Sequence, residues 1–410
     1  MKFLWILGFV SALRVPVGDF LFEKQKILDK FRFSRNSRNQ GIRPEMPRQL
    51  GNVKKVMSPG GKFVFELGSH ESPRLVNELK TALQIVGGFV ENVFVFNTPI
   101  KVHVNHGNYY KNVGIRGKDK GPSVLGKYLI NDDLTIGTCH PVTYNEAGKS
   151  RDSPDYPQAL MIQNGGSRSK THDMVMFVKA CDDCVYAGSY GEDEKSIDLI
   201  NTISHEMSHG LGFTSNFAKG SICDPDGISI RTSYTGKYIL SYVPTSLFDT
   251  HLYTGDKPLH NMFQKLHSTR SYPQPPNTET DCSNKTAHML NKLLATPNSI
   301  YFKTTKGSHV YVETGPNVGG SKVSHMDWGK YNTTLDFLMV PYAVYHGYNL
   351  KQFTRPEDWS TTPFGKLTLE VFETLGYTVN SNPDPNRSQL ALYLQMKKHL
   401  FNPSQQKSLY

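Results

Sequence analysis

The chain has 410 residues, of which 38% are hydrophobic and 20% are charged. A chain of this length forms two or three domains, or one large domain with insertions, and its composition suits a soluble globular protein. The net charge is +10, but residues 1–55 carry 12 Lys and Arg against 4 Asp and Glu, which leaves +2 for the remainder. The basic charge therefore belongs to the leader and gives little support for nucleic acid as a partner of the folded body.

The first residues predict a secretory signal peptide. Lys2 provides the positive start, and Phe3–Leu13 is an apolar run too short to span a bilayer. We place the signal peptide at residues 1–18 and a basic, flexible pro-segment at 19–60; the alternative is that the apolar run forms a buried N-terminal helix. No later apolar run reaches spanning length, so we expect a secreted protein without a transmembrane segment.

Three N-x-S/T sequons and five cysteines fit the secretory route, and the sequons predict a glycoprotein. In an oxidising compartment the cysteines predict two disulfides and one spare thiol. Cys139 would pair with Cys181 or Cys184, and Cys223 with Cys282. The sequons begin at Asn284, Asn332 and Asn386.

We expect order to begin near Ser72, where Ser72-Pro73 suits the N-cap and first position of a helix. Apolar residues follow at helical spacing over 75–86. Alternating apolar residues then predict strands at 100–104 and 174–178, directly before a second helix over 199–211.

The later chain is less regular. Residues 216–320 hold turns, a Pro-rich loop and a short helix at 286–295, and we interpret them as a disulfide-tied insertion. Thr368–Leu375 predicts a helix that Gly376 ends. The expected divisions of the chain are 1–18, 19–60, 61–215, 216–320, 321–380 and a tail at 381–410.

The helix over 199–211 carries the pattern H-E-x-x-H. At ~100° per residue, His209 lies about 40° and Glu206 about 100° from His205, so two imidazoles and one carboxylate share an arc. The imidazoles can bind one Zn²⁺, and the carboxylate can act as general base on a zinc-activated water. The opposite face is apolar at every fourth residue, namely Leu199, Ile203, Met207 and Leu211.

A catalytic zinc usually has three protein ligands and a water. The extended pattern H-E-x-x-H-x-x-G-x-x-H would supply a third histidine, but here Gly212 is followed by Ser215, whose hydroxyl is a poor zinc ligand. Ser324-His325-Met326-Asp327-Trp328, followed by Asp336–Tyr342, offers a better candidate. In these segments the chain resembles the leishmanolysin-like metzincins and related secreted bacterial and fungal peptidases.

In that family HExxHGLGF is followed by a long insertion, a histidine and a Leu-Met-x-Pro Met-turn. The likeness covers roughly residues 75–380 and is specific at His205–Phe213, Ser324–Tyr342 and Thr368–Tyr377. It implies an α+β, metzincin-like zincin with a mixed-sheet N-terminal subdomain, the HExxH helix, and an irregular C-terminal subdomain that contains the Met-turn. The residues carried over are His205, His209 and His325 as ligands of one Zn²⁺, Glu206 as general base, and Met339 in the turn beneath the metal. Tyr342 and Tyr345 are further candidates for stabilising the oxyanion.

The resemblance therefore predicts a secreted zinc endopeptidase that acts on proteins or peptides. Asp327 is an alternative third ligand, because carboxylates also bind zinc, and Glu370 or Glu373 would fill that role in a gluzincin-type hydrolase. A rival of another class is a catalytically inactive binding or adhesion protein on the same fold. No cysteine precedes Cys139, so a pro-segment cysteine latch on the zinc is absent.

Overall fold

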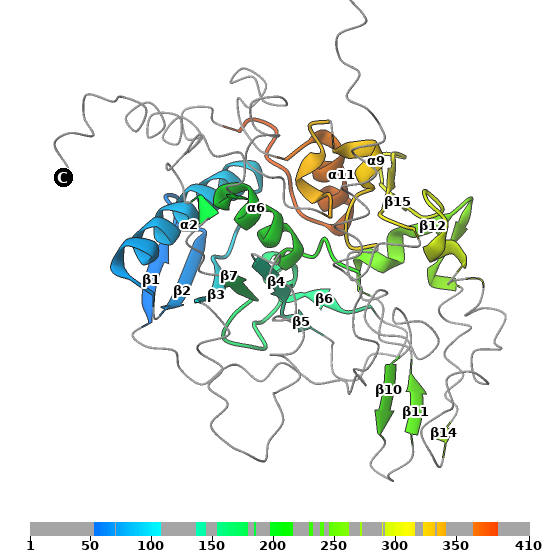
Figure 1. Cartoon of the computed structure of the whole chain (residues 1–410), viewed down its shortest axis with the longest axis horizontal. Coiled ribbons are helices and arrows are strands. Elements are labelled where there is room, and N and C mark those ends of the chain that lie inside the picture. Colours follow the sequence, from blue (N-terminus) through cyan, green and yellow to red (C-terminus); the bar gives the residue numbers. More distant parts are fainter. Residues whose placement is uncertain are drawn as a thin grey trace, which may run out of the picture. The chain divides into compact units, whose positions relative to one another are not determined.

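A five-stranded mixed sheet organises the computed structural model of the chain (Figure 1). Its strand order is β1-β2-β3-β7-β4; the three middle strands run parallel, and β1 and β4 are antiparallel to their neighbours. Apolar residues alternate along each middle strand, so that one face of the sheet is fully buried. The strands are β1 (Lys54–Met57), β2 (Phe63–Ser69), β3 (Ile100–His106), β7 (Met174–Val178) and β4 (Gly137–Pro141).

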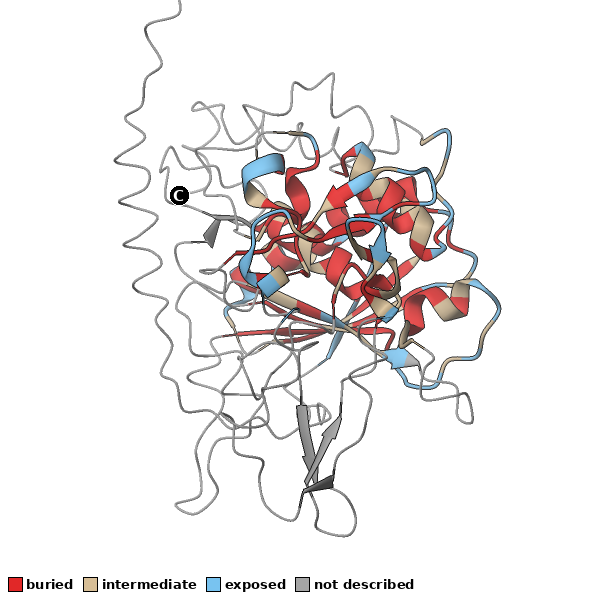
Figure 2. Ribbon diagram, turned by 90° about the vertical axis from the view of Figure 1, so that its right-hand side faces the viewer, coloured by how far each residue is buried: buried red, intermediate tan, exposed pale blue. Residues whose placement is uncertain are grey.

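Two helices, α2 (Pro73–Val93) and α6 (Leu199–Gly210), pack beside each other on that buried face. The Ser72 hydroxyl accepts a hydrogen bond of 3.4 Å from the Leu75 N–H, which confirms the predicted cap of α2. The predicted apolar stripe of α6 is at most 1% exposed. Buried residues are concentrated between the sheet and its helices (Figure 2). The chain is thus α+β with a mixed sheet, as expected.

The structure describes one compact unit within Gln40–Tyr410. The described residues are 53–69, 71–107, 137–144, 154–178, 184–185, 197–215, 229–232, 238–241, 246–261, 271–272, 289, 292–315, 323–332, 334–341 and 364–383. The predicted signal peptide, most of the pro-segment and the tail beyond residue 383 lie outside them. No helix in these ranges is both long and apolar enough to cross a bilayer.

Order begins earlier than the sequence predicts. The predicted pro-segment boundary at residue 60 falls in the turn between β1 and β2, where Lys54 pairs with Leu67 and Met57 with Val64. β2 is the first parallel strand, and its alternation at Phe63, Phe65 and Leu67 was available in the sequence. Residues 54–57 are therefore a strand and not flexible chain, because a basic, polar composition concealed a strand whose partner begins after a turn of five residues.

Described parts of residues 216–320, the predicted insertion, pack into the main core. Phe248 lies 4.9 Å from Phe213, and Phe302 lies 4.8 Å from Phe248, measured between ring centroids. These rings belong to the same hydrophobic core as the HExxH helix. A four-stranded sheet, in the order β13-β12-β15-β16, therefore extends the core instead of standing apart from it.

The predicted C-terminal helix is α11, which Gly376 ends with a left-handed backbone (φ 107°). Its Phe372 packs 6.2 Å from Phe213, so this helix reaches the core beside α6.

The remaining elements are β5 (Thr143–Tyr144), β6 (Tyr156–Pro157), α5 (Gln158–Gln163), β8 (Cys184–Val185), β9 (Ile197–Asp198), β10 (Ser229–Thr232), β11 (Tyr238–Ser241), η1 (Phe248–His251), β12 (Leu252–Thr254), β13 (Lys257–Pro258), β14 (Ser271–Tyr272), β15 (Tyr301–Lys303), β16 (His309–Tyr311), α9 (Trp328–Tyr331), η3 (Phe337–Met339) and α11 (Lys366–Leu375).

Cys139 is a free, buried thiol on β4. The expected pairing of Cys139 with Cys181 or Cys184 is therefore not present. Its side chain faces α6, where a Cβ added to Gly210 would meet the sulfur at 2.7 Å. Cys223 and Cys282 lie outside the described residues, so their predicted disulfide stays a prediction.

Candidate metal centre

The HExxH pattern lies on α6, as predicted. His205 and His209 stand one turn apart and their rings meet edge to face, with centroids 4.7 Å apart. Met207 and the rest of the apolar stripe fix the opposite side of the helix in the core. The two imidazoles contact later parts of the chain, whereas the Glu206 side chain contacts β4.

His325 reaches the same place from a segment that runs antiparallel to the end of β16. The Glu313 N–H donates to the His325 carbonyl at 2.8 Å, and the Asp327 N–H donates to the Tyr311 carbonyl at 3.0 Å. On its other side, the Met326 N–H donates to the Met339 carbonyl at 2.7 Å. Backbone pairing on both sides thus positions a histidine that follows His209 by 116 residues.

The three imidazoles converge on one point. Nε2 of His205 lies 3.0 Å from Nε2 of His209, and Nε2 of His325 lies 3.2 Å from each of them. In the part of the chain that the structure describes, these are the one group of three His, Cys, Asp or Glu side chains whose ligand atoms lie within 4.8 Å of one another. His325, which the resemblance implied as third ligand, therefore lies beside His205 and His209.

The hydrogen bonds of the Nδ1 atoms show which ring nitrogens could bind a metal. Nδ1 of His205 lies 2.5 Å from the Leu338 carbonyl oxygen, and Nδ1 of His209 lies 2.6 Å from the Phe213 carbonyl oxygen. A carbonyl only accepts, so both Nδ1 atoms carry the hydrogen and both Nε2 atoms present lone pairs. Two lone pairs 3.0 Å apart repel each other unless a cation lies between them.

Burial keeps these rings neutral. It lowers the pKa of His205 to about 4, against a smaller opposing effect of the Leu338 carbonyl. It lowers the pKa of His209 further, and the neighbouring His205 and His325 add to that shift. Neutral imidazole is the form that binds a metal.

The three nitrogens fit a tetrahedral zinc ion. Zn–N bonds of about 2.0–2.1 Å at tetrahedral angles place neighbouring nitrogens about 3.3–3.4 Å apart, close to the separations found here. Imidazole also suits Cu, Ni and Fe, so the donor set alone leaves the choice of metal open. Three protein ligands leave a fourth position for water or substrate, which is the arrangement of catalytic zinc sites.

Glu206 lies beside the edge strand β4. A Cβ added to Gly137 would meet Cγ of Glu206 at 3.1 Å, so the strand approaches the helix closely where it has no side chain. Burial raises the pKa of Glu206 to about 8, while a hydrogen bond from the backbone of Cys139 opposes the shift. A divalent cation beside the carboxyl group would favour its ionised form.

The alternative third ligands have other partners. Asp327 accepts from the Lys330 N–H at 2.9 Å and so caps α9. Glu370 accepts a hydrogen bond of 3.3 Å from the Thr304 hydroxyl, and Glu373 forms an ion pair of 2.5 Å with Lys306. None of the three belongs to the histidine group.

Ser215 stands where the extended pattern would have a histidine, and it has a structural role. Its hydroxyl donates to Asp249 at 2.5 Å, and its N–H donates to the Ser324 hydroxyl at 3.0 Å. The second bond joins the exit of α6 to the residue before His325. Ser215 therefore helps to hold the two ligand-bearing segments together.

Met339 is fully buried in η3, which packs against α6. Tyr342 and Tyr345, the candidate oxyanion stabilisers, lie outside the described residues. The carbonyls of Leu338 and Phe213 and the contribution of β4 to the Glu206 environment were not predicted. Backbone atoms carry no sequence signal, and β4 (Gly137–Pro141) has no alternating pattern to reveal it.

A family model described as SPBPB7E8-like matches residues 277–408. The match covers less than half of the chain, and it includes His325 and Met339 but not the HExxH helix. No curated protein and no solved structure matches the chain.

Proposed function

We propose that the chain is a secreted zinc-dependent endopeptidase of metzincin type. The observation that carries the proposal is the convergence of three histidine nitrogens, 3.0–3.2 Å apart, with Glu206 next to His205 on the same helix. Bound zinc would supply a Lewis acid that polarises the scissile carbonyl and lowers the pKa of a water molecule.

The residues of the chain do the remaining work. His205, His209 and His325 would hold the ion. Glu206 would accept a proton from the attacking water and then give it to the leaving amine, the two tasks that hydrolysis of a peptide bond requires of one general base and acid. Burial and a hydrogen bond from the Cys139 backbone restrict the position of its carboxyl group.

The signal-peptide prediction supports secretion, and the resemblance to leishmanolysin-like metzincins supports a peptide substrate. The third ligand distinguishes this proposal from a gluzincin-type hydrolase, because Glu370 and Glu373 are engaged elsewhere. Met339 would lie in the turn below the metal.

The test is cleavage of a peptide pool by the full chain, with metal content measured on the same sample. We expect about one zinc per chain and loss of cleavage by a factor of about 10² or more in Glu206→Gln, because a general base contributes about that much. Zinc content should persist, since the substituted side chain is not a ligand. Glu78→Gln, on α2, removes the same charge at a distant position and should leave cleavage unchanged.

Two outcomes would contradict the proposal. Full activity in Glu206→Gln would remove the general base from the mechanism. A wild-type chain that binds zinc but cleaves nothing in the pool would favour a binding protein on a peptidase fold.

A further inference from the structure

The helix α11 has no capping side chain at its own N-terminus. Its N-cap is Gly365, which has no side chain to accept a hydrogen bond from the first turn. The first N–H groups of a helix have no partner within the helix, so buried ones need an acceptor from elsewhere. That acceptor is the carboxylate of Asp336, which precedes Thr368 of the first turn by 32 residues.

Asp336 takes the place of an N-cap residue. Its Oδ1 accepts a hydrogen bond of 2.9 Å from the Thr368 N–H and lies 3.2 Å from the Thr368 hydroxyl. Burial raises the pKa of this carboxyl group, whereas hydrogen bonds from Thr368 and from the Leu367 N–H lower it. Leu367 and Thr368 are the second and third residues of the helix, whose N–H groups an N-cap side chain usually binds. A Cβ added to Gly365 would collide with Oδ1, so the carboxylate fits closely against the start of the helix.

The same carboxylate lies at the start of η3, since Asp336 directly precedes that turn. Two residues later, the Leu338 carbonyl receives the Nδ1 hydrogen of His205. The Thr368 hydroxyl also lies 3.6 Å from Sδ of Met326, the residue after His325. The first turn of α11 therefore contacts both of the later segments that meet at the histidine group.

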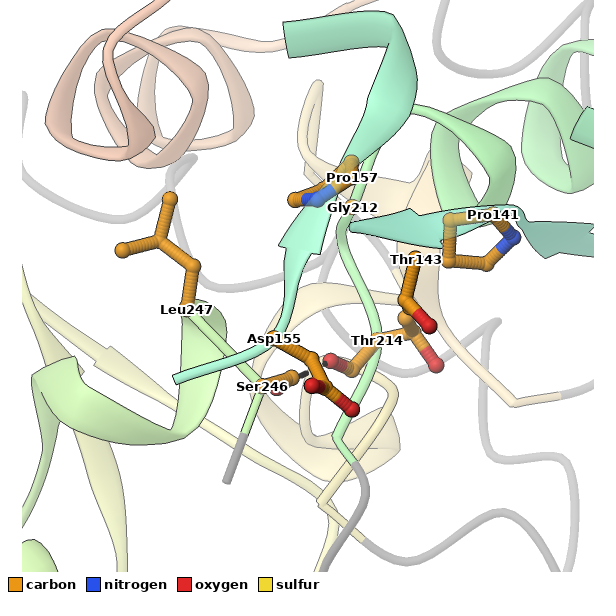
Figure 3. A pocket seen from close by; sticks show the side chains of 8 residues that line it. All are labelled: Pro141, Thr143, Asp155, Pro157, Gly212, Thr214, Ser246 and Leu247. Atoms are coloured by element: carbon orange, nitrogen blue, oxygen red, sulfur yellow. Dashed lines mark hydrogen bonds between the residues drawn. The ribbon is translucent and has the colours of Figure 1, made fainter. Parts of the chain in front are cut away.

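His209 is oriented by other contacts. Its Nδ1 faces the Phe213 carbonyl, at the exit of α6. The next carbonyl, that of Thr214, accepts a hydrogen bond of 2.8 Å from the Ser246 hydroxyl, which Figure 3 shows beside a small pocket. These contacts come from the exit of α6 and from residue 246, and not from η3. The two histidines of the HExxH helix are thus fixed by different parts of the chain.

We propose that Asp336 is a positioning residue of the metal centre, which holds the Leu338 carbonyl against His205 by joining η3 to the first turn of α11. The proposal rests on the histidine group of the proposed function but not on peptide cleavage. Asp336 acts through the backbone of η3, so it is not a catalytic residue. His205 depends on this carboxylate and His209 does not, which is the difference that a test can measure.

The first measurement uses metal-free protein labelled with ¹⁵N in its histidines, because NMR then distinguishes the Nδ1–H from the Nε2–H tautomer. In the wild type, we expect the Nδ1–H form for both His205 and His209. In Asp336→Ala, His205 should lose its single tautomer while His209 keeps the Nδ1–H form. The two signals are assigned by their absence from His205→Gln and His209→Gln.

The second measurement is zinc affinity by competitive titration. An outer hydrogen bond to a metal ligand is worth about 10- to 100-fold in affinity, so partial loss of one in Asp336→Ala should weaken binding at least about threefold. Asp336→Asn keeps one acceptor oxygen and should retain more affinity than the alanine variant. Ser72→Ala removes the N-cap of α2 and is the matched control: it should lower the Tm and leave zinc affinity and both tautomers unchanged.

A milder variant keeps the test decisive if Asp336→Ala does not fold. Thr368→Val removes the hydroxyl beside Asp336 and keeps the N–H that the carboxylate caps. The Nδ1 hydrogen of His205 should then exchange with water faster than in the wild type, while that of His209 should not change.

Three results bear on the proposal in different ways. A lower Tm in Asp336→Ala with an unchanged His205 tautomer and unchanged zinc affinity would overturn it, because the carboxylate would then serve α11 alone. An equal effect on His205 and His209 would overturn it as well. A wild-type chain that binds no zinc, with a change at His205 alone in Asp336→Ala, would support the role of Asp336 and overturn the proposed function instead.

Discussion

The Leu338 carbonyl oxygen lies 2.5 Å from Nδ1 of His205, a hydrogen bond between residues 133 positions apart. The next carbonyl, that of Met339, accepts from the N–H of Met326, which adjoins His325. One short turn, η3, therefore fixes the tautomer of one predicted ligand and the backbone position of another. Hydrogen bonds of this kind orient ligands and raise their basicity.

Replacing the buried side chain of that turn should weaken the metal centre. Met339 is fully buried, so Met339→Ala should cost about 2–5 kcal/mol of unfolding free energy and lower zinc affinity by about tenfold or more. Urea unfolding in the presence of a chelator and competitive zinc titration measure the two effects. Met339→Leu, which keeps the volume, should cost less than about 1.5 kcal/mol. Unchanged zinc affinity in Met339→Ala would show that η3 does not position the ligands.

Removing the metal should destabilise the wild-type chain and not a ligand variant. Zinc at a hundredfold excess over its dissociation constant adds about 2.7 kcal/mol to stability. Chelation should therefore lower the Tm of the wild type but have little effect on His325→Ala. His309→Ala, which removes an exposed histidine of β16, is the matched control and should respond to chelator like the wild type. An equal response of His325→Ala would place the third ligand elsewhere.

Gly212 should not tolerate a side chain. Its φ is 112°, and an added Cβ would lie 2.6 Å from Cγ of Pro157. Gly165 has a φ of 81° but open space around it. A comparison of the two positions therefore separates the cost of backbone strain from the cost of the collision with Pro157. We expect Gly165→Ala to cost about 1 kcal/mol and Gly212→Ala to cost at least about 1–3 kcal/mol more, as measured by chemical denaturation. Equal costs would mean that Pro157 moves aside freely.

A carboxylate on β2 should contribute stability that depends on pH. Glu66 lies 2.8 Å from Nε2 of His172, and this hydrogen bond lowers the pKa of Glu66 below its ordinary value of 4.5. A lowered pKa means that the contribution is present above pH 4.5 and is lost as the pH falls through the folded-state value. Glu66→Gln should therefore be less stable than the wild type at pH 7, by at most about 1 kcal/mol because the pair is partly exposed, and the difference should shrink as the pH falls below 4.5. A constant difference across that range would exclude an ionic contribution.

The sequence predicted the elements whose pattern is local. α2, β3, β7, α6 and α11 all follow from apolar spacing and from caps such as Ser72 and Gly376. It also predicted His205 and His209 as neighbours, because four residues on a helix fix their geometry.

Other features depended on contacts that no local pattern records. His325 was inferred through a resemblance, since only backbone pairing with the end of β16 and with Met339 brings it to α6. The predicted disulfide of Cys139 is absent. The number of cysteines in a sequence does not show which face of β4 the thiol occupies. The residues around 246–315 seemed irregular because strands of two or three residues are too short for periodicity to be detected.

The wide spacing of the histidine group also bears on how the chain is synthesised. Leu338 follows His205 by 133 residues, and a ribosome that adds about 5–20 residues per second needs roughly 7–27 s to cover that distance. Until then a nascent chain has the HExxH helix without the carbonyl that orients its first histidine and without the residues that follow His325. If the chain has the proposed function, metal capture would be postponed until most of the chain has been made, and hydrolysis could not start on the ribosome.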